Sequence, residues 1–196
     1  MADKLLKKRI SEHLETAKLL LSDEKLQQDT ENLAQRIIAC YSKGGKVLFM
    51  GNGGSASEAQ HMAAEFLGKY LLERKALPAI ALTANTSTLT AIANDYSYEM
   101  VFKRQIEALA SKEDVVVGFS TSGNSPNVVQ GLKCAKSRGI FTAALVGQKK
   151  CAIDLLPDIC IKAPGAAAPR IQEMHTLIMH SICEMVEATL VKEGVI

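Results

Sequence analysis

The sequence predicts an α/β protein in which helices cover both faces of a mainly parallel sheet of five strands. After residue 45, short apolar runs alternate with segments of helical period, and each apolar run is too short to form a helix. Such alternation is typical of parallel sheets, because the crossover between parallel strands is usually a helix. The 196 residues, of which 47% are hydrophobic, suffice for one core, since a chain of this length buries roughly 70% of its unfolded surface.

The chain begins with two helical patterns that lie outside this alternation. Apolar residues recur at helical spacing from Leu5 to Leu21, and a second pattern runs from about Leu26 to Tyr41 before Gly44 and Gly45 end it. We interpret residues 1–43 as a helical extension of a single domain that spans residues 1–196. The apolar face of this extension has to be buried, either against the chain's own domain or against another subunit. We expect the second arrangement, a homo-oligomer.

The rest of the chain holds the strands and the helices between them. The expected strands are Lys46–Met50, Ala79–Leu82, Val115–Phe119, Phe141–Val146 and Ile159–Ile161. The expected helices are Ser57–Leu67, Phe102–Leu109, Asn127–Arg138 and Arg170–Lys192, and a further helical stretch ends at Asn94 and Asp95. Right-handed crossovers should join the strands into one sheet.

Composition excludes several classes of function. The formal net charge is +2 with both signs interspersed, which does not favour a nucleic-acid-binding protein. The longest apolar runs fall far short of the ~20 residues that a membrane helix needs, and the N-terminus lacks the apolar core of a signal peptide. The five cysteines are scattered and never form a C-x-x-C pair, as is typical of a reducing compartment. We therefore expect a cytoplasmic protein with no membrane partner.

The first glycine-rich loop, Gly51-Asn52-Gly53-Gly54-Ser55-Ala56-Ser57, follows the first strand and precedes a helix. Its glycines let the backbone approach a ligand, and Ser55 or Ser57 can cap the helix. The spacing resembles a dinucleotide fingerprint, but the second strand ends at Thr83 without the acidic residue that would bind a ribose. We therefore do not expect NAD.

The second loop, Ser120-Thr121-Ser122-Gly123-Asn124-Ser125-Pro126, places four hydroxyl groups before a helix. Hydroxyls and backbone N–H groups at a helix N-terminus form a cradle for an anion such as a phosphate monoester. The alternative is a polar turn with a serine cap. No Walker lysine is present, which disfavours nucleoside triphosphate chemistry.

The two loops together resemble the sugar isomerase (SIS) family, and within it the phosphoheptose isomerases. The resemblance extends over nearly the whole chain. It implies a flavodoxin-like three-layer αβα sandwich, a phosphosugar ligand and a homotetramer. The substrate-binding residues that it implies are Asn52, Gly53, Gly54, Ser55, Glu65, Asn94, Asp95, Ser120, Thr121, Ser122, Ser125 and Gln172. From the sequence pattern alone, Asn94 and Asp95 could equally be a helix stop and a turn.

Four polar residues on two helices could form a metal site. His61 and Glu65 are four residues apart and share a helix face, and Gln172 and His180 are eight apart, about 80° around the axis. Imidazole, carboxylate and amide groups suit zinc, although His61 and Glu65 could instead be a surface ion pair. The resemblance implies one zinc ion bound by His61, Glu65, Gln172 and His180. His175 should pack in the core or face solvent, and His13 should be exposed with no partner.

The resemblance implies an enzyme that converts D-sedoheptulose 7-phosphate to D-glycero-D-manno-heptose 7-phosphate through a cis-enediol, the first step of bacterial ADP-heptose or GDP-heptose synthesis. Glu65 would be the base and His180 the acid. One alternative is a non-catalytic SIS adaptor that associates with the replication initiator DnaA; another is an arabinose 5-phosphate or hexulose 6-phosphate isomerase. Lys69 and Pro169 depart from residues that some relatives have there, an arginine and an acid.

Overall fold

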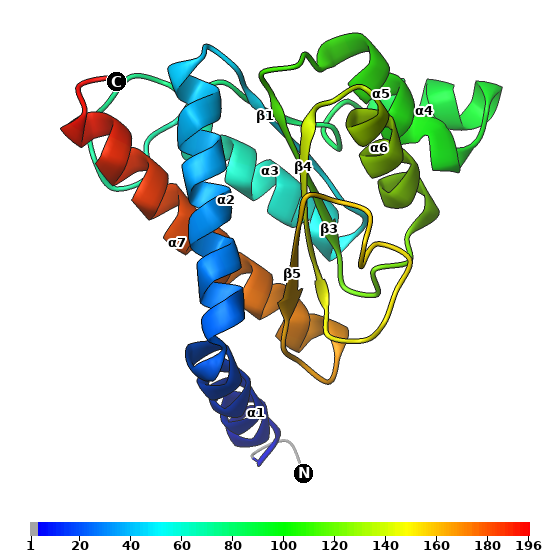
Figure 1. Cartoon of the computed structure of the whole chain (residues 1–196). Helices are drawn as coiled ribbons and strands as arrows, with labels where there is room; N and C mark the ends of the chain where they lie inside the picture. The colour runs from blue at the N-terminus through cyan, green and yellow to red at the C-terminus, as the bar shows by residue number, and fades with distance from the viewer. Residues whose placement is uncertain (1–3) are drawn as a thin grey trace.

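The computed structural model describes residues 4–196 and has three layers, with a five-stranded sheet between two groups of helices (Figure 1). All strand pairs are parallel, and the order across the sheet is β2-β1-β3-β4-β5. The strands are β1 (Val47–Met50), β2 (Ala79–Ala81), β3 (Val115–Ser120), β4 (Phe141–Gly147) and β5 (Ile159–Ala163). This is the strand order of flavodoxin, so the predicted fold class is confirmed.

The central strands are buried on both faces, which explains why they appear in the sequence as continuous apolar runs rather than alternating ones. Every residue of β1 and of β3 is buried. Val47 pairs with Ala79 on one side and with Val115 on the other, so β1 is flanked by β2 and β3. The chain direction across the sheet reverses between β1 and β3, and ligands of such sheets bind beyond the strand ends at this point.

Helices α2 (Glu24–Ser42), α3 (Gly54–Leu67) and α7 (Ala168–Lys192) cover one face of the sheet (Figure 1). Helices α4 (Thr86–Asp95), α5 (Val101–Leu109) and α6 (Pro126–Ser137) cover the other, with the short 3₁₀ helix η2 (Tyr98–Met100) between α4 and α5. A separate hydrophobic core lies on each face. The predicted helices and strands are all present, with ends displaced by three residues at most.

Helix α1 (Leu5–Ser22) extends away from the sheet, in dark blue in Figure 1. It is amphipathic, but several of its large apolar side chains are exposed: Leu5, Leu6, Ile10, Leu14, Leu19 and Leu21. The prediction for His13 was wrong. His13 is half-buried, and its Nδ1 lies 2.7 Å from Glu173 Oε2 on α7. A partner 160 residues away along the chain has no local signature in the sequence.

The start of α3 also differs from the expectation. The helix begins at Gly54, and no side chain caps it, so the predicted Ser55 or Ser57 cap is wrong. Gly53 has φ +56°, a conformation that glycine adopts without strain, and its carbonyl accepts hydrogen bonds from the N–H groups of Ala56 and Ser57. The glycine turn itself therefore closes the helix end, and Ser55 is buried.

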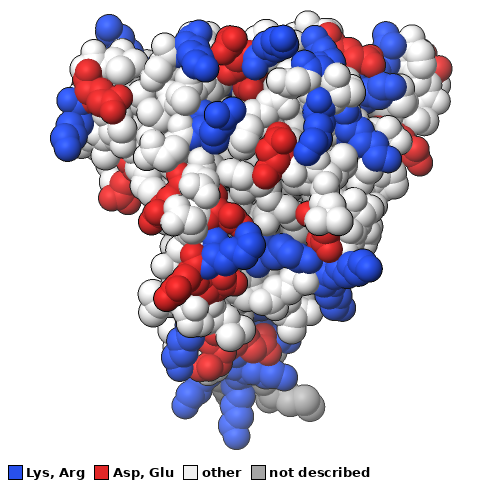
Figure 2. Space-filling view, viewed as in Figure 1, with Lys and Arg blue, Asp and Glu red and all other residues white. Residues whose placement is uncertain are grey.

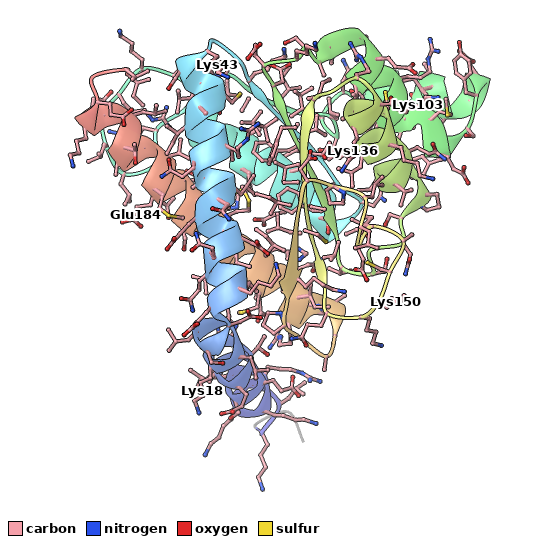
Figure 3. All side chains as sticks on the ribbon, viewed as in Figure 1. Lys18, Lys43, Lys103, Lys136, Lys150 and Glu184 are labelled. Atoms are coloured by element: carbon pink, nitrogen blue, oxygen red, sulfur yellow. The ribbon has the colours of Figure 1, made fainter. Side chains whose placement is uncertain are left out.

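Positive and negative side chains are mixed on the face that Figure 2 shows, in agreement with the interspersed charges of the sequence. Lys18 on α1 points outward into solvent (Figure 3). Within residues 4–196, no helix is both long enough and apolar enough to cross a bilayer. All five cysteines are free.

Candidate active site

The two predicted loops lie side by side at the carboxyl ends of β1 and β3, where the strand order reverses. A reciprocal pair of hydrogen bonds between Asn52 and Asn127 joins them, each 2.8 Å long. The chain topology brings the two loops together, because adjacent parallel strands deliver their following loops to the same edge of the sheet. Residues 51–54 and 120–127 therefore form the rim of one candidate site.

The hydroxyl groups of the second loop converge as an anion cradle requires. Ser120 Oγ lies 2.9 Å from Ser125 Oγ and 3.5 Å from Ser122 Oγ. Ser125 is the N-cap residue of α6 but makes no side-chain capping hydrogen bond, and Pro126 occupies the first turn. The Ser125 hydroxyl thus faces the loop rather than its own helix, and the helix N-terminus adds a partial positive charge.

A cavity of about 330 Å³ opens beside this loop. Thr121, Ser122 and Asn124 line one side of it, and Lys149 and Lys150 belong to the segment after β4 that lines another. Figure 3 shows Lys150 projecting outward from that segment. The two lysines were not singled out in the sequence, because a Lys-Lys pair in a loop is an ordinary surface feature.

Asn94 and Asp95 end α4, as the sequence indicated, and both side chains are exposed. Asn94 Nδ2 donates to Asp95 Oδ1 at 3.0 Å. The following residues turn back to the first loop, since Tyr98 Oη donates to Asn52 Oδ1 at 3.1 Å. The α4–η2 segment is therefore tied to the glycine loop through Tyr98.

His61, Glu65 and His180 form a compact cluster on the paired helices α3 and α7. One ligand atom from each lies within 4.8 Å of the others. His61 Nε2 is 2.9 Å from Glu65 Oε1 and 3.4 Å from His180 Nε2. A simple surface pair of His61 and Glu65 does not describe the arrangement fully, because His180, 119 residues away in the sequence, contacts His61 as well.

Gln172 lies apart from this cluster within the chain. It is two helical turns before His180, about 12 Å along α7, and its side chain packs against Gly54 at the start of α3. A Cβ atom at position 54 would collide with the Gln172 amide, so a larger residue there would displace the Gln172 side chain. Gln172 thus faces the glycine loop, and its place in a metal ligand set remains a prediction.

Contacts between α3 and α7 advance in the same direction along both helices, so the two helices run parallel. Gln172 meets Gly54, Thr176 Oγ1 donates to Glu58 Oε2 at 2.7 Å, and His180 meets His61. The other oxygen of Glu58 is buried without a partner among the described residues. Burial raises the pKa of the Glu58 carboxyl, against the opposing effects of the Thr176 hydrogen bond and the two histidines.

The loop after α3 is held by a buried carboxylate on α7. Glu187 accepts hydrogen bonds from the N–H groups of Tyr70, Leu71 and Leu72 at 2.7–2.9 Å. Its charged partner is Arg74, whose Nε lies 2.9 Å from Glu187 Oε1, and both side chains are almost fully buried. Burial, which raises the pKa of Glu187, is outweighed by these hydrogen bonds, so its pKa is lowered.

Glu187, Arg74 and the bound backbone of residues 70–72 form a buried clamp, which supports the His61–Glu65–His180 cluster from two sides. Arg74 Nη2 donates to the backbone carbonyl of Glu65 at 2.8 Å, which satisfies one of the free carbonyls at the end of α3. Tyr70, held at its N–H by Glu187, places its ring 5.5 Å from the ring of His180. Lys69, the position that departs from some relatives, is exposed and forms an ion pair with Glu73.

Two other residues marked in the sequence have structural positions. His175 is buried against Phe119, which supports the packing alternative, and burial lowers its pKa to about 4. Pro169 lies in the first turn of α7, where its missing N–H leaves no hydrogen bond unmade.

Comparison with known proteins agrees with this architecture. The SIS domain family matches residues 13–147. The phosphoheptose isomerase of Helicobacter pylori strain P12 is 48% identical over 187 residues, which are 95% of this chain and 96% of that protein. The structure of the phosphoheptose isomerase from Neisseria gonorrhoeae has a TM-score of 0.89 and 37% identity, covering 96% of this chain and 100% of that one.

A second solved structure, a phosphoheptose isomerase from Francisella tularensis, has a TM-score of 0.91 at 29% identity and covers 96% of this chain and 99% of the other. The agreement extends over the N-terminal helices, the sheet and α7 together, since nearly the whole chain is matched in sequence and in structure. The chain therefore belongs to the phosphoheptose isomerases of the SIS domain family.

Proposed function

We propose that this chain is an isomerase that converts D-sedoheptulose 7-phosphate to D-glycero-D-manno-heptose 7-phosphate through a cis-enediol, supplying bacterial ADP-heptose or GDP-heptose synthesis. The observation that carries the proposal is the His61–Glu65–His180 cluster, which unites a carboxylate and two imidazoles on α3 and α7. These are groups suited to proton transfer near neutral pH. The relatives with nearly full coverage are named for the same activity.

The reaction moves one proton between neighbouring carbons. In the ketose, C2 carries the carbonyl and C1 carries the hydrogens, so the base takes a proton from C1 while a proton is added to the C2 oxygen. The enediol then receives a proton at C2 and loses one from the C1 oxygen, which gives the aldose. Glu65 is the proposed base and His180 the proposed acid, since each has a second polar atom, Oε2 and Nδ1, outside the cluster contacts.

The donor set of the cluster fits a zinc ion. Two nitrogens bound to one tetrahedral ion at 2.0–2.1 Å lie about 3.4 Å apart, which is also the His61–His180 nitrogen distance. Three protein ligands and one open position are the pattern of a catalytic zinc. His61, Glu65 and His180 would hold the ion. Gln172, about 12 Å along α7 from His180, does not join them within one chain, and its place in the ligand set, which the family resemblance implies, remains a prediction. A bound zinc supplies a Lewis acid that polarises a carbonyl oxygen.

The loop of residues 120–125 is the proposed phosphate anchor. Its converging hydroxyls at the start of α6 suit a dianion. Asn52 and Gln172 belong to or contact the adjoining glycine loop, and Asn94 and Asp95 precede Tyr98, which contacts Asn52; these four residues are the proposed contacts of the sugar. His61 is seven residues beyond Gly54, about 10 Å along α3, so the sugar must extend away from the anchor towards the cluster. Anchoring one end orients the reacting end.

A homotetramer is the proposed assembly. The exposed apolar side chains of α1 need a cover, and Leu67, Leu71, Leu72 and Leu177 are also exposed on the α3–α7 side near the cluster. A partner copy there would exclude water from the reacting groups. We further propose a cytoplasmic location, which five free thiols support, and a single SIS domain over residues 1–196 with residues 1–43 as its extension. The DnaA-binding adaptor is disfavoured, because both Glu65 and His180 are present and adjacent.

The proposal is tested by following sedoheptulose 7-phosphate in D₂O by NMR, before and after treatment with a chelator. We expect deuterium incorporation and formation of the aldose, loss of both with the chelator, and recovery when zinc is returned. Absence of turnover with zinc present would refute the proposed reaction. Light scattering of the same sample measures the assembly.

A further inference from the structure

Asn127 is a buried amide between the two loops of the site. It lies in the first turn of α6, is 2% exposed, and none of the resemblance-based residue roles includes it. Its Oδ1 accepts from Asn52 Nδ2 and its Nδ2 donates to Asn52 Oδ1, both at 2.8 Å. A buried amide in reciprocal contact with a loop residue fixes the orientation of that residue.

The orientation of this pair is determined by the backbone. The N–H of Val128 donates to Asn127 Oδ1 at 3.0 Å. Because an N–H group must face an acceptor, the Asn127 oxygen has to lie on that side and the Asn127 nitrogen on the side of Asn52 Oδ1. The Asn52 amide cannot rotate by half a turn without placing its nitrogen against the Asn127 nitrogen.

Asn52 Oδ1 is consequently occupied. It accepts from Asn127 Nδ2 and from Tyr98 Oη at 3.1 Å, which uses both of its lone pairs. Asn52 Nδ2 gives one of its two hydrogens to Asn127, and the other has no partner among the described residues. Asn52 is only partly buried, so towards the open rim of the site its amide offers a hydrogen-bond donor and no acceptor.

We propose that Asn127 and Tyr98 are positioning residues that hold the Asn52 amide as a donor to an oxygen atom of the sugar, a hydroxyl or the carbonyl. This inference rests on the proposed function. Asn127 sets the orientation from the first turn of α6, and Tyr98 completes it from the α4–η2 segment that also bears Asn94 and Asp95. The contact of Tyr98 with Asn52 thus couples two parts of the sugar site.

The test compares Asn127→Asp with Tyr98→Phe in the full-length, zinc-loaded protein. The aspartate keeps the acceptor for Val128 and adds a charge that a helix N-terminus tolerates, but it removes the donor to Asn52 Oδ1. The phenylalanine removes only the Tyr98 hydroxyl, on a side chain that is 56% exposed, so folding is preserved. Asn32→Asp, at an exposed position of α2, is the matched control.

Two constants are measured for each protein: KM for sedoheptulose 7-phosphate, and Kd for inorganic phosphate by calorimetry. We expect Asn127→Asp to raise KM about tenfold and Tyr98→Phe about threefold, with kcat changed less than threefold. For Asn127→Asp, the factor by which KM rises should be at least about five times the factor by which phosphate Kd rises, which separates lost sugar contact from added charge. For Tyr98→Phe, which adds no charge, phosphate Kd should stay at the wild-type value. Asn32→Asp should change neither constant.

The inference is overturned if the wild type turns over substrate while both variants keep its KM, or if KM and phosphate Kd rise together. A loss confined to kcat would also overturn it, since that result places the two residues in the chemical step. An inactive wild type is a different outcome, which refutes the proposed reaction. In that case calorimetry measures Kd for sedoheptulose 7-phosphate and for inorganic phosphate in the same three variants. The donor role of Asn52 holds if Asn127→Asp and Tyr98→Phe weaken binding of the sugar phosphate more than binding of inorganic phosphate, and it fails if they do not.

Discussion

Replacing Glu187 with glutamine should destabilise the protein far more than the loss of an ordinary surface charge. The carboxylate is buried, and each of its oxygens accepts two hydrogen bonds: Oε1 from the N–H of Tyr70 and from Arg74, and Oε2 from the N–H groups of Leu71 and Leu72. Glutamine has the same shape but only one acceptor oxygen. Two donors would therefore face an amide nitrogen, and the Arg74 guanidinium would be buried without a counter-charge.

Removing one partner of a buried ion pair costs about 3–5 kcal/mol, and two buried donors left unsatisfied at about 1–3 kcal/mol each give a similar cost, about 2–6 kcal/mol. A domain of this size changes its Tm by roughly 2–4 °C per kcal/mol, so Tm should fall by about 10 °C. The measurement is urea unfolding at pH 7.5 followed by circular dichroism, with thermal unfolding as a second readout.

Glu73→Gln is the matched control. It makes the same chemical change in the same loop, but Glu73 and its partner Lys69 are both largely exposed. Surface pairs of this kind contribute little, so the control should unfold at the wild-type urea concentration. If Glu187→Gln also unfolds there, the buried clamp contributes nothing and the reasoning fails.

The pH dependence of the same clamp follows from its pKa. The folded-state pKa of Glu187 is lowered, so its stabilising contribution is complete above the ordinary value of 4.5 and is lost as pH falls below it. The stability difference between wild type and Glu187→Gln should therefore shrink in acid. A difference that stays constant from pH 7 to pH 3 would contradict the assignment.

Three further predictions concern single residues. Glu65→Gln and His180→Gln should each abolish turnover of sedoheptulose 7-phosphate while inorganic phosphate still binds in calorimetry; activity within a few-fold of wild type would remove the assigned role. Ser120→Ala, which deletes a buried hydroxyl of the loop, should weaken phosphate binding about tenfold, whereas Ser137→Ala at the end of α6 should not. His175 has a pKa lowered to about 4 from 6.5, so the unfolded chain takes up its proton first and stability falls as pH drops through this window. The wild type should lose about 2 kcal/mol by pH 5 from this group, and His175→Gln should not, as urea unfolding at pH 7.5 and pH 5 will measure.

Most of the fold could be predicted from local patterns. The buried strands β1 and β3 appear as unbroken apolar runs, and α2 shows its apolar face at helical spacing, because the period of side chains along an element is local. Helix ends were less exact. The start of α3 depends on the positive φ of Gly53, and neighbouring serines suggested a cap that the backbone does not use.

The candidate site was predicted in part. His61 and Glu65 are one turn apart, so their contact follows from helix geometry alone. Arg74, Glu187 and Asn127 were missed, since each is an ordinary polar residue whose importance comes from burial and from partners that are remote in sequence. Glu187 lies 113 residues from Arg74, and Asn127 lies 75 residues from Asn52.

The sequence by itself determined the α/β class, the order of helices and strands, the glycine and hydroxyl loops and the residue types available for chemistry. These depend on side-chain period and turn chemistry, which act over a few residues. Only the tertiary structure decided that α3 and α7 pack in parallel, so that His180 reaches His61 while Gln172 stays at Gly54. That choice depends on how two helices bury their apolar faces against the same side of the sheet, and such packing relates residues more than a hundred positions apart.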